Sequence, residues 1–255
     1  MEETIEAFPV HKYTVQLYYV KKRESNNYED APPPEQIASG VLVRWTSKYF
    51  LITCKHVFEN INIDDVVILT SDGFAVRLPN KIKFIDDEKR SIDLAMIEFH
   101  SYRLEELKSH FSFLPSKNLG FGHEFEEELF YMLYGYINKK TTREGFSFFD
   151  GPFGYLTGIR NYKKFEEMGF SYENNITLEY NRRKQSYLYD EIEKKSMGPK
   201  DLKGLSGGGI WLSVEGKKPD TYEYILVGIM IEERIDRGFV IGTKIELIEK
   251  HIAKP

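Results

Sequence analysis

Short runs of β-branched and aromatic residues, separated by polar or glycine-containing turns, follow one another from residue 39 onward. The first two runs are separated only by Thr46, Ser47 and Lys48, which is typical of a hairpin. Short strands at such spacing favour a β-sandwich or a β-barrel. In the first half of the chain the predicted strands occupy residues 39–45, 49–53, 66–69, 74–78, 81–85 and 93–99.

The second half continues this pattern and adds helical segments. Residues 103–111 and 162–170 favour helical turns, and the segment TKIELIEKHI predicts a closing amphipathic helix, with apolar residues at positions 245, 247, 248 and 252. Further strands are predicted at residues 128–136, near Phe153, and at 175–180, 209–214, 224–231 and 238–243.

Two segments depart from the strand pattern. Residues 21–38 are polar and contain three consecutive prolines, which predicts an exposed, extended loop. Residues 139–200 are rich in Lys, Arg, Glu, Asn and Tyr and are longer than a hairpin array needs. We therefore expect an inserted segment in the second β unit.

Composition predicts a folded protein with no general affinity for nucleic acid or membranes. The 255 residues are 41% hydrophobic and 15% aromatic, and the net charge of −5 gives no attraction to phosphate backbones. The start MEETIEAFPVHKYTV lacks the basic and apolar regions of a signal peptide, and no apolar run approaches the roughly 20 residues of a membrane span. Cys54 is the single cysteine, which suits a cytoplasmic location.

Three short motifs that lie far apart in the sequence carry candidate chemistry. His56 follows the predicted strand of YFLITCKHVF, Asp93 begins the strand DLAMIEF, and Ser206 lies in the glycine-rich segment GLSGGG. A serine hydroxyl becomes a nucleophile only with a base, a group that orients this base, and donors for the developing oxyanion. The chain supplies these residue types in the order His, Asp, Ser.

In this order the motifs resemble those of the chymotrypsin-like (trypsin-like) serine peptidases, of the intracellular bacterial type. The matching segments are Thr53–His56, Asp93–Ala95 and Gly204–Gly208, and the resemblance extends over roughly residues 39–250. It implies an all-β fold of two six-stranded antiparallel β-barrels with a C-terminal helix. Residues 1–118 would form the N-terminal barrel with His56 and Asp93, and residues 119–255 the C-terminal barrel with Ser206.

The resemblance also implies a role for each residue. Ser206 would attack the scissile carbonyl, His56 would accept and return the proton, and Asp93 would orient the histidine. The backbone N–H groups of Gly204 and Ser206 would form the oxyanion hole, and neither a cofactor nor a metal ion is expected. An extended substrate would pair with strand walls that contain Met230, Ile231 and Glu232 on one side and Phe239 and Val240 on the other.

Two positions differ from the secreted members of the family. Leu205 replaces the Asp that pairs with a newly freed N-terminus, so we expect no such zymogen switch. Gly209 replaces a common proline, which leaves the rigidity of the turn undetermined. The base of the specificity pocket would lie near Lys200 and Asp201, and the side-chain preference stays undetermined.

Other interpretations of the motifs concern single residues. Cys54 lies on an apolar strand, which favours a buried, inert thiol. His123 lies in GHEFEEELF, which lacks the second histidine of a zincin helix and favours a solvated acidic loop. The basic run at 181–184 favours an exposed turn. Because the histidine precedes the serine, an α/β-hydrolase esterase is disfavoured.

The sequence therefore predicts a cytoplasmic serine endopeptidase with a protein or peptide substrate. A cytoplasmic protease needs restraint, so we expect narrow specificity or a regulatory protein partner, and a bacterial stress or defence system is a compatible setting. The alternative is a catalytically inactive or latent binding or scaffold protein with the same fold.

Overall fold

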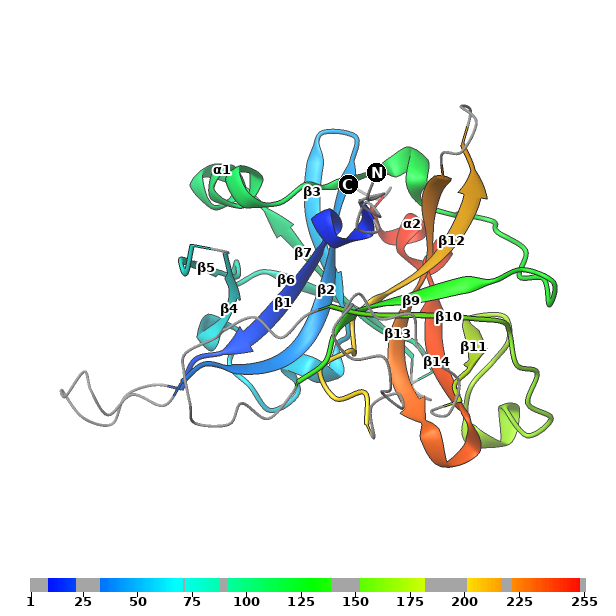
Figure 1. The fold of residues 1–255 in the computed structure, drawn as a ribbon. Helices are drawn as coiled ribbons and strands as arrows, with labels where there is room; N and C mark the ends of the chain where they lie inside the picture. The colour runs from blue at the N-terminus through cyan, green and yellow to red at the C-terminus, as the bar shows by residue number, and fades with distance from the viewer. Residues whose placement is uncertain are drawn as a thin grey trace, which may run out of the picture.

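The computed structural model describes residues 9–21, 33–70, 72–87, 91–138, 152–181, 201–216 and 222–252. These residues form two sheets in which all strand pairs but one are antiparallel, with two α-helices (Figure 1). The predicted all-β fold class is therefore confirmed.

The first sheet has the strand order β5-β4-β1-β2-β3-β7-β6, and the short β8 pairs with β2 in parallel. The β2–β3 hairpin is closed by the pair Trp45 and Lys48, and Thr46 in its turn has a φ of 53°. The strands are β1 (Thr14–Tyr19), β2 (Glu35–Trp45), β3 (Lys48–Thr53), β4 (Val66–Leu69), β5 (Ala75–Arg77), β6 (Ile82–Asp86), β7 (Asp93–Phe99) and β8 (Leu114–Pro115).

The second sheet has the strand order β10-β9-β12-β13-β14-β11. A bridge between Ile159, just after β10, and Leu178 in β11 joins the two ends of this order, which closes the sheet on itself. The strands are β9 (Tyr131–Tyr136), β10 (Pro152–Thr157), β11 (Asn175–Glu179), β12 (Gly209–Glu215), β13 (Tyr222–Arg234) and β14 (Phe239–Lys244).

The first sheet differs from the prediction at its beginning. It contains eight strands instead of six, because β1 was not predicted and β8 adds two residues beside β2. The expected loop also ends earlier, since Glu35–Ala38 already belong to β2 and pair with β1. Polar residues hide this strand pair in the sequence: Thr14 and Gln16 are buried although neither is apolar.

The helices agree with the predicted segments. They are α1 (Ser101–His110) and α2 (Glu246–Ile252), and Ile245, Ile248 and Ile252 are buried beside or within α2, as their spacing predicts. The remaining helical turns are the 3₁₀ segments η1 (Pro9–Tyr13), η3 (His56–Phe58), η4 (Ile63–Asp65), η5 (Ser116–Asn118), η6 (Glu166–Met168) and η7 (Ile235–Arg237). Of the expected insertion, residues 139–151 and 182–200 lie outside the described residues.

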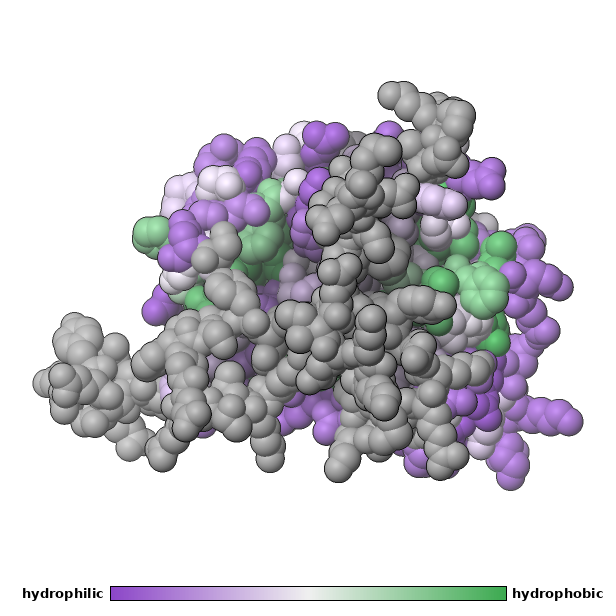
Figure 2. Space-filling view, in the orientation of Figure 1, coloured by the Kyte–Doolittle hydropathy of each residue, from purple (hydrophilic) through white to green (hydrophobic). Residues whose placement is uncertain are grey.

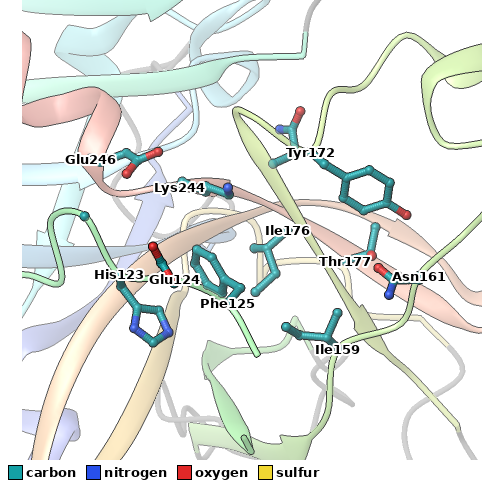
Figure 3. Close-up of a pocket in the computed structure, with 12 residues that line it drawn as sticks. His123, Glu124, Phe125, Ile159, Asn161, Tyr172, Ile176, Thr177, Lys244 and Glu246 are labelled. Atoms are coloured by element: carbon teal, nitrogen blue, oxygen red, sulfur yellow. The ribbon is translucent and has the colours of Figure 1, made fainter. Parts of the chain in front are cut away.

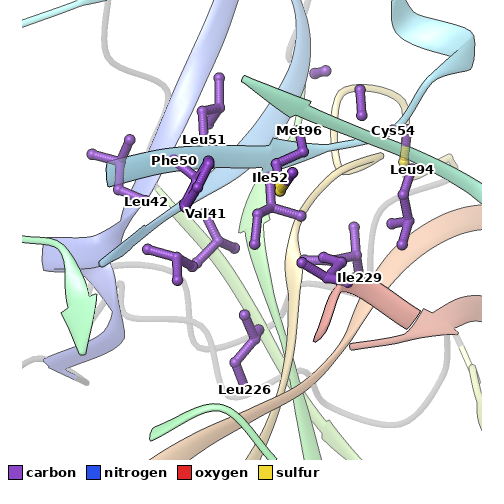
Figure 4. Close-up of a cluster of buried hydrophobic side chains, with 14 of the residues drawn as sticks. Val41, Leu42, Phe50, Leu51, Ile52, Cys54, Leu94, Met96, Leu226 and Ile229 are labelled. Atoms are coloured by element: carbon purple, nitrogen blue, oxygen red, sulfur yellow. The ribbon is translucent and has the colours of Figure 1, made fainter. Parts of the chain in front are cut away.

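One hydrophobic cluster contains residues of both sheets. Leu51 and Ile52 of β3 and Leu94 of β7 belong to it together with Leu226 and Ile229 of β13, and all of them are fully buried (Figure 4). Each such side chain contributes about 1.5–3 kcal/mol when it is removed from water. The cluster therefore holds the end of β3 against β13, and this contact brings the candidate catalytic segments together.

Where the described residues are visible in Figure 2, most of them are hydrophilic, and hydrophobic residues show at separate places. The large hydrophobic side chains that are exposed come from different elements, and scattered residues of this kind need no functional explanation. No helix in the described ranges is long and apolar enough to cross a membrane. The exposed residues are Phe74, Phe84, Tyr102, Phe130, Leu156, Tyr172 and Tyr222.

Candidate active site

His56 and Asp93 are joined by two hydrogen bonds. His56 begins η3 directly after β3, and Asp93 is the first residue of β7, which pairs with β3. The Nδ1 atom of His56 lies 2.5 Å from Oδ2 of Asp93, and the backbone N–H of His56 donates to Oδ1 at 2.9 Å. A carboxylate in this position places a proton on Nδ1 and leaves Nε2 as the acceptor that a general base requires.

The charge environment of His56 favours its protonated form. Burial by itself would lower the pKa of His56, but the hydrogen bond to Asp93 and the negative charges of Asp93, Glu59 and Glu232 outweigh burial and raise this pKa above its ordinary value. The imidazole is 41% exposed and the Asp93 side chain 16% exposed. The histidine is therefore open to a reacting group while its orienting carboxylate is covered.

Ser206 lies on a turn whose backbone shape depends on glycine. Gly204 and Gly207 have φ angles of +93° and +85°, in the left-handed region that L-residues rarely adopt. A Cβ atom on Gly207 would lie 2.1 Å from the backbone oxygen of Ser39 and 2.2 Å from Oγ1 of Thr53. The glycines that flank the candidate nucleophile are thus required by φ and by close packing.

Every carbonyl group from Lys203 to Ser206 accepts a hydrogen bond. Because the C=O and N–H of a trans peptide point in opposite directions, these bonds also determine where the N–H groups point. The four bonds are Asn138 N–H to Lys203 O (2.7 Å), Ser39 Oγ–H to Gly204 O (2.9 Å), Gly208 N–H to Leu205 O (2.8 Å) and Ser39 N–H to Ser206 O (2.8 Å).

Two N–H groups of the turn have no acceptor in the part of the chain that the structure describes. The N–H of Leu205 donates to Leu202 O at 2.9 Å, and that of Gly207 donates to Met230 O at 2.8 Å. Among the residues that the structure describes, the N–H groups of Gly204 and Ser206 have no acceptor. These are the two donors that the sequence assigns to an oxyanion hole.

The carbonyl of Met230 connects the turn with the histidine segment. It accepts both the Gly207 N–H and, at 3.1 Å, the Cys54 thiol, two residues before His56. The hydrogen bonds within the described ranges do not include one between the Ser206 hydroxyl and His56. Catalytic hydrogen bonds in ligand-free sites are often long and shorten only when substrate binds.

Cys54 lies beside the catalytic candidates and is fully buried. Burial and the nearby charge of Asp93 raise the pKa of this thiol, so it is neutral and acts as a hydrogen-bond donor. One ligand atom each of Cys54, His56 and Asp93 lie within 4.8 Å of one another, the one such group of possible metal ligands in the described ranges.

A cavity of about 270 Å³ opens beside His56 and Asp93. Of the residues predicted to contact substrate, Ile231 and Glu232 line it, whereas Met230, Phe239 and Val240 are buried. Burial raises the pKa of Glu232, although Arg234 acts in the opposite direction. The other lining residues are Lys55, Glu59, Asp86, Asp87 and Ile92.

Solved structures with a similar fold cover nearly the whole chain. The scabies mite inactivated protease paralogue SMIPP-S-I1 matches with a TM-score of 0.57 and 14% identity, over 95% of this chain and 93% of that one. The VesB protease of Vibrio cholerae gives the same scores over 95% of this chain, which spans 63% of the length of VesB. The paralogue SMIPP-S-D1 gives a TM-score of 0.56 and 13% identity, over 95% and 91% of the two chains.

The chain has the chymotrypsin-like serine protease fold. No protein-family model and no curated protein matches it. At these identities the likeness shows the fold alone, and two of the three similar structures are inactivated paralogues.

Within the chymotrypsin-like fold, Leu205 occupies a position in the protein interior. It is fully buried in a hydrophobic cluster of the second sheet that also contains Leu133, Ile210 and Val227. An apolar side chain here stabilises the turn by packing, where secreted family members would place a carboxylate.

The region expected to form the specificity pocket is only partly described. Lys200 lies outside the described residues, and Asp201 is exposed. The Glu233 carboxylate on β13 accepts the N–H of Leu202 at 2.5 Å, so it connects the strand wall to the segment before Ser206.

A second cavity, of about 500 Å³, lies on the second sheet (Figure 3). His123 lines it, and its Nε2 atom lies 3.1 Å from the Tyr131 hydroxyl; burial lowers the pKa of His123. The Lys244 ammonium lies 5.2 Å from the centre of the Phe125 ring. This cavity is larger than the one beside His56, but neither His56, Asp93 nor Ser206 lines it. His56 and Asp93 line the smaller cavity, so we assign the chemistry to that one.

Proposed function

We propose that the protein is a serine endopeptidase that hydrolyses peptide bonds through Ser206, His56 and Asp93. One observation carries this proposal: among the described residues, the N–H groups of Gly204 and Ser206 have no acceptor, whereas those of Leu205, Gly207 and Gly208 do. The Met230 carbonyl joins this turn to Cys54, two residues before the histidine that Asp93 orients. A structural turn gains nothing from two unpaired donors, whereas an oxyanion hole requires them.

The proposed reaction has two stages. The Ser206 hydroxyl attacks the substrate carbonyl while Nε2 of His56 takes its proton, and the oxyanion forms opposite the Gly204 and Ser206 N–H groups. His56 then protonates the leaving amine and an acyl-enzyme remains. Water repeats the sequence and releases the second product. Asp93 holds the imidazole in place and stabilises its charged form throughout.

The substrate of the proposed reaction is a protein or peptide that binds in an extended form beside β13. Glu232 would contact it directly, since this side chain lines the cavity beside His56. The proposal includes a cytoplasmic location and control by narrow specificity or by a regulatory partner, because Leu205 leaves no carboxylate for a zymogen switch of the secreted type.

A second candidate function is binding without turnover. The inactivated paralogues among the similar structures favour it, as does the lack of a hydrogen bond between Ser206 and His56 within the described ranges. A latent protease or a scaffold of this fold would retain the two sheets and the buried cluster between them.

Labelling with a fluorophosphonate probe separates these candidates without a known substrate. The purified protein and its His56→Ala and Ser206→Ala variants are treated with the probe, and the modified peptide is identified by mass spectrometry. An assembled site gives modification at Ser206 in the wild type and none in either variant. Unmodified wild-type protein would support the binding function.

A further inference from the structure

Ser39 is a fully buried residue of β2 that hydrogen-bonds to the turn that carries Ser206. Its N–H donates to Ser206 O at 2.8 Å and its hydroxyl donates to Gly204 O at 2.9 Å. The same hydroxyl oxygen accepts the N–H of Tyr136, at 2.8 Å, from β9 of the other sheet. A single residue thus binds two carbonyls of the catalytic turn and a strand of the second sheet.

We propose that Ser39 is a positioning residue that keeps the Gly204 and Ser206 N–H groups pointed at the oxyanion. This inference rests on the proposed function, and it adds a residue that none of the sequence motifs contains. Ser39 does not contact the reacting atoms; it acts through the peptide groups of the turn.

Backbone geometry explains why the carbonyl bonds matter. The N–H of Ser206 belongs to the peptide between residues 205 and 206, and Ser39 holds the carbonyl of the peptide on each side of it. The N–H of Gly204 belongs to the peptide between residues 203 and 204. The carbonyl of this peptide, Lys203 O, accepts the N–H of Asn138 at 2.7 Å. The N–H of Gly208 holds the Leu205 carbonyl of the peptide that carries the Ser206 N–H, so the two bonds from Ser39 complete a set that fixes four consecutive peptides.

The glycines make such a clamp necessary. Gly204 and Gly207 reach positive and negative φ angles with similar ease, so the turn has alternative shapes that a less flexible sequence would forbid. The bonds within the turn, from Leu205 N–H to Leu202 O and from Gly208 N–H to Leu205 O, leave the Gly204 and Ser206 carbonyls to contacts from outside it. Ser39 supplies two such contacts, and Thr53 Oγ1 anchors the Ser39 carbonyl at 2.7 Å.

The hydroxyl, and not only the backbone, is the specific contribution of serine. Any residue except proline could donate its N–H to Ser206 O. Without the hydroxyl, Gly204 O and Tyr136 N would both lose a hydrogen-bond partner in a buried location. Buried polar groups without partners are costly, so the Gly204 carbonyl would turn to find another donor. This rotation would move the Leu205 N–H of the same peptide away from Leu202 O and would shift the two adjoining peptides, which carry the Gly204 and Ser206 N–H groups.

The test compares Ser39→Ala with Thr14→Val. Thr14 is also fully buried, lies on the neighbouring strand β1, and donates its hydroxyl to Val10 O at 3.0 Å. Within the described ranges its side chain makes no hydrogen bond to the turn that carries Ser206. Ser39→Ala removes a buried hydroxyl that hydrogen-bonds to two residues, Gly204 and Tyr136, and Thr14→Val removes a buried hydroxyl that hydrogen-bonds to one. The fluorophosphonate reaction is resolved into its binding constant and its maximal rate, and unfolding is followed in parallel.

Ser39→Ala is expected to lower the maximal rate about 10²- to 10³-fold, as loss of one oxyanion donor does, with little change in probe binding. Thr14→Val is expected to keep the wild-type rate. A wild-type rate in Ser39→Ala, or an equal loss in both variants, would overturn the positioning role.

Crystal structures of both variants give a second readout that does not need activity. The proposal requires the peptide between Gly204 and Leu205 to be turned in Ser39→Ala and unchanged in Thr14→Val; an unchanged turn in Ser39→Ala would refute it. Wild-type protein that the probe never modifies would instead refute the proposed function, and the crystal structures would still decide the role of Ser39.

Discussion

The close approach of Gly207 to the first sheet allows a quantitative prediction for Gly207→Ala. An alanine Cβ would lie 2.1 Å from Ser39 O and 2.2 Å from Thr53 Oγ1, and both distances are far below normal contact. The φ of +85° costs an L-residue about 1–2 kcal/mol even without a clash. Because Ser39 is buried in a paired strand, the turn has to move and the strand does not.

This movement would break the bonds that hold the turn. The N–H of Gly207 to Met230 O and the N–H of Ser39 to Ser206 O each contribute about 0.5–1.5 kcal/mol net. With the cost of φ included, Gly207→Ala should lower the free energy of unfolding by about 2–5 kcal/mol. A displacement of about 1 Å at Ser206 should slow fluorophosphonate labelling roughly 10²-fold.

Gly73→Ala is the matched control. Gly73 has the same φ of +85°, but a Cβ there would meet nothing within 4 Å. In urea denaturation, Gly73→Ala should therefore lower the free energy of unfolding by about 1–2 kcal/mol, which is the cost of the positive φ alone. Its labelling should proceed at the wild-type rate. The reasoning is refuted if the two variants are equally stable, or if Gly207→Ala reacts as fast as wild type.

Three further predictions concern the charges and packing of the site. Asp93→Asn should reduce labelling about 10⁴-fold while the fold is kept, because an amide N–H facing Nδ1 would select the wrong tautomer; near-normal labelling would contradict the role of Asp93. Labelling of the wild type should fall as pH drops through the raised pKa of His56, since only the neutral imidazole is a base. Glu232→Gln removes a charge that raises this pKa, so the midpoint should move to lower pH, and a midpoint that stays or rises would contradict the assignment. Leu205→Asp should be among the most destabilising single changes, because it places an unpaired carboxylate in a fully buried position; thermal denaturation close to that of wild type would contradict the packing described for Leu205.

Strand positions were predictable where apolar residues dominate a short run. The segment DLAMIEF corresponds to β7, Asp93–Phe99, because its apolar residues are continuous and buried. The strand β1 was missed, since buried Thr14 and Gln16 interrupt the apolar pattern with polar residues whose burial depends on tertiary contacts.

The candidate site shows a similar division. The motifs around His56, Asp93 and Ser206 were visible because their chemistry needs particular residue types. Ser39 and Asn138 could not be recognised in the sequence, because they bind backbone carbonyl groups. Every residue has a backbone carbonyl, so no residue type marks such a contact. The predicted wall residue Met230 is buried while Glu232 faces the cavity, since the register between β13 and β14 shifts between these residues and no local pattern announces that shift.

Cleavage of peptides is the direct test of whether Ser206 is the nucleophile of a peptidase. A mixture of peptides with diverse sequences is incubated with the wild-type protein and with Ser206→Ala, and new peptide termini are identified by mass spectrometry. The account predicts internal cleavage products with the wild type and none with the variant. Identical products from both proteins would show that the hydrolysis does not depend on Ser206 and would contradict the account.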